Sequence, residues 1–179
     1  MCELYDYYWR EYTGAIPVDA VSGGYDVNGR TTYIGQAYIK QWGIFPVTIY
    51  PGKKSVLAPI RGICEIDNHI KVMCSSTTQN FKWIPANAAD LHVKCINLHL
   101  VRGGVENESV LNIGRVVYQN EIVVGKVCGF RVGKALMYFP DANKKKELHT
   151  ESYEVLICKS NSDAAMPRSN KMTPVREGR

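Results

Sequence analysis

The sequence contains no long apolar segment and no run typical of a secretory signal. Among its 179 residues the longest uninterrupted apolar run is only Ala135 to Phe139, far short of the roughly 18 residues that a membrane-spanning helix needs. The opening MCELYDYYWREY carries four charged side chains where a signal peptide would need an apolar stretch. We therefore expect no transmembrane segment and a cytoplasmic protein.

Amphipathic helical periodicity is also missing. No segment longer than about ten residues spaces its apolar positions three, four and seven apart between two capping residues. Val and Ile together number 32, against 20 for Leu and Ala, and β-branched side chains favour strands. The sequence therefore predicts an all-β domain, with a two-residue hairpin turn at Asn28-Gly29. The expected strands cover 31–39, 44–50, 62–66, 69–74, 96–101, 111–118, 121–130, 134–139 and 151–158.

Motifs for catalysis and for metal binding are absent or weak. The sequence lacks G-x-S-x-G, G-x-x-x-x-G-K-[ST] and H-E-x-x-H. Two looser groups of zinc-type ligands lie at 64–74 (C-x4-H-x4-C) and 92–99 (H-x2-C-x3-H), without the paired C-x2-C spacing of structural zinc sites. The second group would share one face only in a helix, and we expect a strand there. We therefore expect no enzyme, no metal and no cofactor, and reduced cysteines that are mostly small buried hydrophobes.

The charge distribution gives little indication of a nucleic-acid partner. The net charge is +5, of which +3 falls in residues 159–179, so residues 1–158 are nearly neutral. The segment 159–179 lacks apolar periodicity and is interpreted as a flexible basic tail. Lys144 to Lys146, with Arg131 and Lys134 nearby, could contact nucleic acid or an anionic membrane surface. Because this run lies among turn formers and lacks interleaved aromatic residues, we expect a solvated loop and no nucleic-acid binding.

The chain matches itself at an offset of about eighty residues. GGYD (23–26) matches GGVE (103–106), YIGQAYI (33–39) matches NIGRVVY (112–118), and PVTI (46–49) matches VGKV (124–127). A fourth match pairs NFKWI (80–84) with SYEVL (152–156). Four matches in one order predict a single domain, 1–158, made of two related β units, about 7–86 and 87–158. We expect these tandem units to pair about a pseudo-twofold axis and to share one core.

These repeated motifs resemble the DM-nine repeat proteins of invertebrates, which are also found fused to natterin-like pore-forming modules. The likeness covers about residues 7–158. It is carried by Trp9, Ile16 to Asp26, Gly29, Arg30, Tyr33 to Tyr38, Ile113 to Val127, Glu147 with His149, and Tyr153 to Leu156. The resemblance implies an all-β protein of two intertwined antiparallel units, often a homodimer, with mannose-type carbohydrate binding and suspected roles in innate immune recognition of pathogens.

The resemblance also implies where a sugar would bind: at the acidic residue after the glycine pair and at the lysine of the P/V-G-K turn. A carboxylate accepts sugar hydroxyls and an ammonium donates to another oxygen. In the second repeat these residues are Glu106 and Lys126, with Glu121 as an additional acceptor. The first repeat keeps Asp26 but has Thr48 in place of the lysine, which weakens that site.

Two readings of these residues therefore stay open. The first is a non-enzymatic, mannose-type lectin-like recognition protein with Glu106 and Lys126 as its principal contacts. The second is a cytosolic protein-interaction or structural module with degenerate sugar sites, in which Asp26 and Glu106 only accept backbone N–H bonds in their own turns. The lack of a signal peptide favours the second reading, whereas the intact acid and base of the second repeat favour the first.

Overall fold

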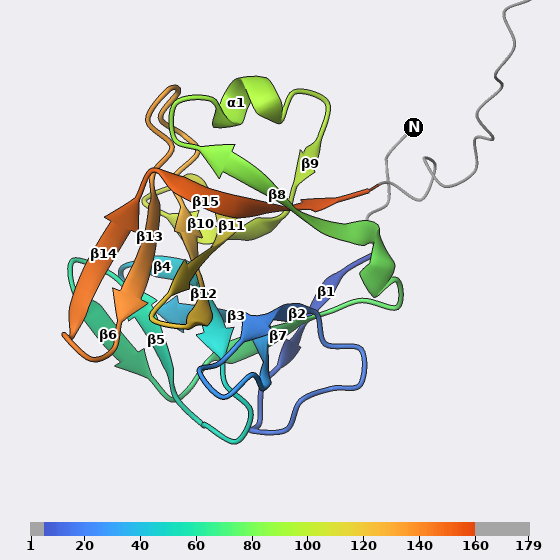
Figure 1. Ribbon diagram of the computed structural model, residues 1–179. Coiled ribbons are helices and arrows are strands. Elements are labelled where there is room, and N and C mark those ends of the chain that lie inside the picture. Colours follow the sequence, from blue (N-terminus) through green and yellow to red (C-terminus); the bar gives the residue numbers. More distant parts are fainter. Residues whose placement is uncertain (1–5, 160–179) are drawn as a thin grey trace, which may run out of the picture.

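The computed structural model describes residues 6–159, and nearly every regular element in that part of the chain is a β-strand (Figure 1). The prediction of an all-β fold is confirmed. The first strands are β1 (Tyr8–Glu11), β2 (Ser22–Tyr25), β3 (Thr31–Ile39), β4 (Gly43–Ile49), β5 (Val56–Pro59), β6 (Ile63–Ile66) and β7 (Ile70–Cys74). The later strands are β8 (Phe81–Asn87), β9 (His99–Leu100), β10 (Arg102–Glu106), β11 (Ser109–Tyr118), β12 (Glu121–Val127), β13 (Met137–Asp141), β14 (Lys146–Thr150) and β15 (Ser152–Cys158). The helical elements are a single 3-10 turn, η1 (Thr78–Asn80), and one short helix, α1 (Leu91–Lys94).

Strand pairing follows the same pattern in the two halves of the chain. β3 pairs antiparallel with β2, β4 and β7, and β11 pairs antiparallel with β10, β12 and β15. The β2–β3 and β10–β11 ladders each carry a register irregularity, between Ser22 and Gly24 and between Arg102 and Gly104. The repeated pairing agrees with the sequence matches, and the pseudo-twofold axis itself stays a prediction.

One of the four sequence matches is wrong. Most of NFKWI lies in β8, which is the hydrogen-bonded partner of β15 and not its counterpart. The counterpart of β15 in the first half is β7. Trp9 of β1 lies opposite Met73 of β7. In the same way, Trp83 of β8 lies opposite Leu156 of β15. Strand pairing therefore groups β8 with the second half and favours a division between η1 and β8 over one near residue 86.

The two halves interlock through glycines. β10 pairs antiparallel with β4, and a Cβ on Gly104 would lie only 1.9 Å from the carbonyl oxygen of Ile44. In the reciprocal position β2 lies against β12, where a Cβ on Gly24 would lie 2.4 Å from the Cβ of Ile122. Any side chain at these positions would push the strands apart, so the GG pairs of the sequence are required by close backbone approach.

The core is continuous between the halves. Its central cluster brings together fully buried side chains from both halves, and Ile34, Ile113, Val124 and Leu156 are among them. One flanking cluster is centred on Phe45 of β4, and the other contains Met137 of β13. Because the central cluster draws on both halves, neither half buries its apolar surface alone.

The expected strands leave out β1, β2, β5, β8, β10 and β14, and two further segments differ in local structure. The turn after β2 has three residues rather than two, since Asp26 N–H donates to Arg30 C=O across Val27 to Gly29, and only Gly29 has a positive φ. The expected strand 96–101 is reduced to β9, and α1 precedes it. Leu91, the first residue of α1, and Cys95, which caps its C-terminal end, are both buried against the core. This tertiary packing explains why the segment forms a helix.

Of the expected tail, 159–179, only Lys159 lies within the described residues. None of the helices in residues 6–159 combines the length and the hydropathy that crossing a membrane requires.

We predict that Gly104→Ala destabilises the protein by at least about 2 kcal/mol, because its new methyl group would meet backbone that cannot move without separating β10 from β4. The matched control is Gly129→Ala, whose Cβ would meet nothing closer than Asn112 Oδ1 at 3.1 Å. Urea unfolding of both variants measures the difference. Equal, small losses in the two variants would contradict an interlock that depends on Gly104.

Candidate functional site

Glu106 and Lys126 meet, as the resemblance implied. The Lys126 ammonium donates to both carboxylate oxygens of Glu106, with Nζ–Oε1 and Nζ–Oε2 distances of 3.1 and 3.0 Å. Glu147 Oε2 lies 3.9 Å from the same nitrogen. Glu106 ends β10, Lys126 lies near the end of β12 and Glu147 lies in β14, so three strands converge to build this cluster, which we call the Lys126 cluster.

Aromatic rings surround the ammonium of the Lys126 cluster. The Nζ atom lies 5.1 Å from the ring centroid of Phe45 and 5.5 Å from that of Tyr138, within the range of cation–π attraction. Lys126 is only 5% exposed, whereas the side chains of Glu106 and Glu147 are 18% and 19% exposed. Both glutamate side chains are therefore partly open to solvent and the lysine is more deeply buried, but Glu147 Oε2 is itself buried and has no hydrogen-bond partner among the described residues.

Burial dominates the electrostatics of this cluster. It raises the pKa of the Glu147 carboxyl above its ordinary value, against the opposing attraction of Lys126. Burial also raises the pKa of the nearby Cys128 thiol to about 11. With two carboxylates beside one ammonium, the cluster favours one ionised pair and tolerates the second carboxylate less well. Cys128 is an unreactive thiol at neutral pH.

The acidic residue of the first half has a different partner. Asp26 Oδ1 accepts the backbone N–H groups of Asn28 and Arg30 at 2.8 and 2.9 Å, and Oδ2 accepts Arg30 Nε at 2.8 Å. These bonds, first of all the backbone bond from Arg30, lower the pKa of the Asp26 carboxyl. Asp26 therefore serves its own turn, and Arg30 takes the place of the missing lysine as its counter-ion.

Thr48 is a structural residue. Its buried hydroxyl accepts the Val124 N–H at 2.8 Å and lies 3.4 Å from the Val124 carbonyl oxygen. In the ladders Val124 lies opposite Arg115, and Pro46 lies at the corresponding place opposite Gln36. Pro46 has no N–H, so the position equivalent to Val124 needs no hydroxyl acceptor. Residue 126, which is equivalent to Thr48, can therefore be a lysine that extends to Glu106.

A groove of about 760 Å³ lies beside Asp26 and Thr48 and is lined by residues of both halves. On one wall Tyr50 donates its hydroxyl to Glu121 Oε2 at 2.9 Å, and on another Tyr118 donates to Asp141 Oδ2 at 2.7 Å. Burial, then the neighbouring Glu121, raises the pKa of Tyr50. The Lys53 ammonium lies 4.9 Å from the centroid of the Tyr50 ring. We call this the Tyr50 groove.

Side-chain size explains why a groove lies beside Thr48 and, within residues 6–159, none of that kind lies over Lys126. The strand registers place Thr48 of β4 with Val123 of β12 where the equivalent pair is Lys126 of β12 with Phe45 of β4. The larger pair fills its space and packs against Tyr138, while the smaller pair leaves the Tyr50 groove open.

The structure brings Glu106 and Lys126 together, and Asp26 accepts backbone N–H groups in its own turn, as the second reading expected. Glu121 of β12 bonds to Tyr50 of the first half instead of lying beside Lys126. Sequence reasoning did not assign site roles to Glu147, Phe45 or Tyr138. Glu147 was part of the resemblance, and its acidic-His motif was the available signal. The aromatic neighbours carry no local signal, because they come from other strands.

The zinc-type groups do not assemble. His92 Nε2 donates to Gly129 C=O at 2.5 Å, and within residues 6–159 no three His, Cys, Asp or Glu side chains are placed to hold a metal ion together. Five cysteines lie in this part of the chain, all as free thiols, and all except Cys64 are buried. The expectation of small buried hydrophobes is confirmed for those four residues.

Comparisons with known proteins bear on the fold. No protein-family model matches the chain, and no curated protein matches it. Among solved structures, the crystal structure of the nematode sperm cell motility protein MFP2B is similar, with a TM-score of 0.53 and 11% identity over 89% of this chain and 48% of that chain. The chain therefore spans about half the length of MFP2B. At this identity the similarity supports the β-rich fold alone.

We predict that Glu106→Gln costs about 2 kcal/mol of stability, because it removes a charge-assisted partner from a nearly buried ammonium. Glu147→Gln is the matched control and is expected to leave stability at neutral pH unchanged or higher, since burial disfavours the Glu147 charge. A carboxyl whose pKa is raised in the folded state makes the protein less stable as the pH rises from the ordinary pKa of that carboxyl to its raised pKa. The gain from Glu147→Gln should therefore grow between acid and neutral pH in urea unfolding. A larger loss from Glu147→Gln than from Glu106→Gln would contradict this assignment.

Proposed function

We propose that this chain is a non-enzymatic carbohydrate-recognition protein of the DM-nine type, and that the Lys126 cluster is its binding site. One observation carries the proposal: residues 20 positions apart in sequence, Glu106 and Lys126, bring an acid and a base to 3.0 Å. This is the pair that the resemblance implies for sugar binding. The resemblance is also the source of the preference for mannose-type glycans.

The chemistry of the cluster suits neighbouring sugar hydroxyls. Glu106 and Glu147 have partly exposed side chains whose carboxylate oxygens can accept O–H groups, and the buried Glu147 Oε2 has no hydrogen-bond partner of its own in the described part of the chain. Lys126 lies beneath them and holds Glu106 through two bonds, so the acceptor is ordered before a ligand arrives. A sugar oxygen that approaches the ammonium would compete with these internal bonds, and we therefore expect weak affinity for a single sugar.

Other parts of the proposal rest on the resemblance and on the sequence. A homodimer would present two clusters and raise the affinity for a multivalent glycan. A role in innate immune recognition follows from the family likeness. A cytoplasmic location is part of the proposal, and the free thiols of the described residues are compatible with a reducing compartment.

A second candidate function is a protein-interaction or structural module. The observation that favours it is the burial of Lys126, whose described contacts are all internal and which is only 5% exposed. In this alternative the Lys126 cluster stabilises the junction of β10, β12 and β14 and contacts no ligand.

Calorimetry with mannose and with mannan separates the two functions. We expect the purified protein to bind mannose with a dissociation constant near 1 mM, about 4 kcal/mol, and mannan more tightly. Lys126→Met should weaken binding at least about tenfold through loss of a charge-assisted hydrogen bond. Because this variant leaves Glu106 unpaired, its fold is checked by circular dichroism, and Glu106→Gln serves as a second variant.

The matched control is Asp26→Asn. Asp26 is bonded within its own turn, so this change should alter the stability of the turn and leave sugar binding within about twofold. Absence of heat with mannose and mannan at high protein concentration would support the interaction module. Loss of binding in Asp26→Asn but not in a folded Lys126→Met would move the site to the first half.

A further inference from the structure

Two short segments lie side by side at one end of the molecule. Residues 88–98 contain α1, and residues 128–135 connect β12 to β13. They are joined by the Ala135 N–H, which donates to Ala88 C=O at 2.9 Å, and by the His92 bond to Gly129. In Figure 1 α1 projects beyond β8 and β9, away from the Lys126 cluster strands β10 and β12. We call these two segments together the α1 tip.

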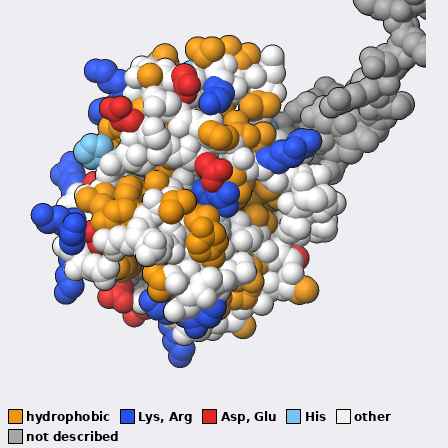
Figure 2. Space-filling model, viewed as in Figure 1, with side chains coloured by type: hydrophobic (Ala, Val, Ile, Leu, Met, Phe, Trp, Pro, Cys, Tyr) orange, Lys and Arg blue, Asp and Glu red, His pale blue; other side chains and the backbone are white. Residues whose placement is uncertain are grey.

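The α1 tip carries a concentration of exposed aliphatic and aromatic side chains. Figure 2 shows apolar side chains gathered at the end of the molecule where α1 lies. Of the twelve large hydrophobic side chains that are exposed in residues 6–159, five belong to these two segments. They are Val93, Ile96, Leu98, Phe130 and Val132, and two of them, Val93 and Val132, are 74% and 82% exposed.

The exposure of these side chains is imposed by a well-anchored backbone. Leu91 is fully buried, Cys95 is buried, and Ala135 at the end of the second segment is fully buried. Leu91 and Cys95 stand four positions apart and share one face, so Val93 between them must point the other way. The apolar surface is therefore held outward by the same contacts that attach the α1 tip to the core.

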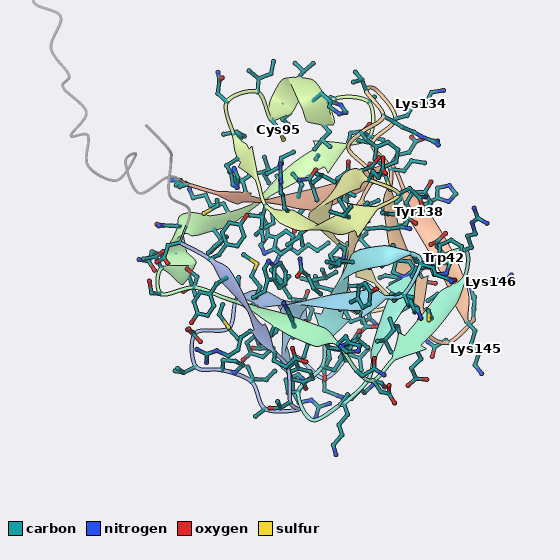
Figure 3. All side chains as sticks on the ribbon, turned by 180° about the vertical axis from the view of Figure 1, so that it is seen from behind. Trp42, Cys95, Lys134, Tyr138, Lys145 and Lys146 are labelled. Carbon is teal, nitrogen blue, oxygen red and sulfur yellow. The ribbon has the colours of Figure 1, made fainter. Side chains whose placement is uncertain are left out.

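Basic residues lie among the exposed apolar ones. The α1 tip contains Lys94, Arg131 and Lys134 against one acidic residue, Asp90, a net charge of +2. All four are exposed. Figure 3 shows Lys134 on the loop next to α1, well separated from Lys145 and Lys146. The Arg131 guanidinium lies 5.8 Å from the centroid of the Phe130 ring, so positive charge and apolar surface occupy the same edge.

We propose that the α1 tip is a peripheral docking surface for an anionic lipid bilayer. Projecting aliphatic side chains can enter the boundary between headgroups and acyl chains, while flanking lysine and arginine are attracted to anionic headgroups. Charge complementarity selects this occupant. A stable protein interface would be expected to group several aromatic, Met or Arg anchors around a packed centre, whereas the α1 tip has Phe130 and Arg131 on one turn and otherwise exposes Val, Ile and Leu.

Binding of this kind is shallow and depends on salt. No helix of the described residues is long and apolar enough to cross a membrane, and the proposed attachment is at the surface, through the α1 tip. Each basic residue contributes about a fivefold factor in affinity for an anionic surface at low salt, and the contribution falls off within a Debye length.

The test is co-sedimentation of the full chain with vesicles of phosphatidylcholine alone and of phosphatidylcholine mixed with phosphatidylserine. We expect binding to the mixed vesicles, weaker binding as salt is raised, and little binding to phosphatidylcholine alone. Val93→Asp should weaken binding at least about tenfold, because it removes an inserted side chain and adds a repelled charge. Lys94→Gln should weaken it about fivefold.

Matched controls lie elsewhere on the surface. Val117→Asp changes an equally large, 66% exposed valine on β11, and Lys145→Gln removes a lysine remote from α1. Both should bind vesicles as the unchanged protein does, and circular dichroism verifies that all variants are folded.

Three results would overturn the proposal: absence of binding to either vesicle, equal losses in Val93→Asp and Val117→Asp, or binding that does not depend on phosphatidylserine. If Val93→Asp instead converted a dimer to a monomer without any vesicle binding, the α1 tip would be a contact between copies. None of these outcomes depends on sugar binding.

Discussion

The close approach of β10 to β4 is the constraint on which the rest of this structure depends. It requires a glycine at position 104, since any Cβ there would overlap the carbonyl of Ile44. By bringing the second half of the chain onto the first, it joins their central core. It also sets Glu106, at the end of β10, opposite Gly43. The charged residues of the candidate site all come from the second half, and the contact between the halves adds Phe45 of β4 beside the Lys126 ammonium.

A single backbone donor explains why the two halves carry different sites. Val124 has an N–H that faces Thr48, and burying it without an acceptor would be costly. Pro46 holds the corresponding place in the other half and has no N–H. Position 48 is therefore committed to a short hydroxyl, while position 126 can hold a long cation. This difference leaves a filled ion-pair cluster around Lys126 and an open groove beside Thr48.

The two proposed surfaces use different physics and lie in different places. The Lys126 cluster is an ordered arrangement of buried charge, in which the ammonium fixes a carboxylate that faces solvent. The α1 tip is an arrangement of exposed apolar side chains among positive charges. The two surfaces adjoin, because the second segment of the α1 tip begins at Cys128, directly after β12 ends. Variants on the far side of the α1 tip, at α1 itself, therefore separate attachment from recognition best.

Sequence by itself determined the fold class and the pairing of Glu106 with Lys126. β-branched composition, short alternating strands and glycine pairs are local properties, and they survive in the all-β structure. The resemblance to DM-nine proteins implied the acid and the lysine, and the self-match at about eighty residues gave their counterparts in the first half, Asp26 and Thr48. The match of NFKWI with SYEVL was wrong because a strand and its hydrogen-bonded partner can both show an alternating apolar pattern, so the pattern does not distinguish a partner from a counterpart.

Only tertiary structure decided which side chains surround these residues. Glu121 precedes Lys126 by five positions, and an odd separation in a strand points the two side chains to opposite faces. It joined Tyr50, 71 positions away, instead of Glu106. Glu147, Phe45 and Tyr138 reached Lys126 from separate strands. The exposure of Val93 followed from burial of Leu91 and Cys95. Distances between strands remote in sequence depend on packing of the whole core, and no local pattern of residues encodes them.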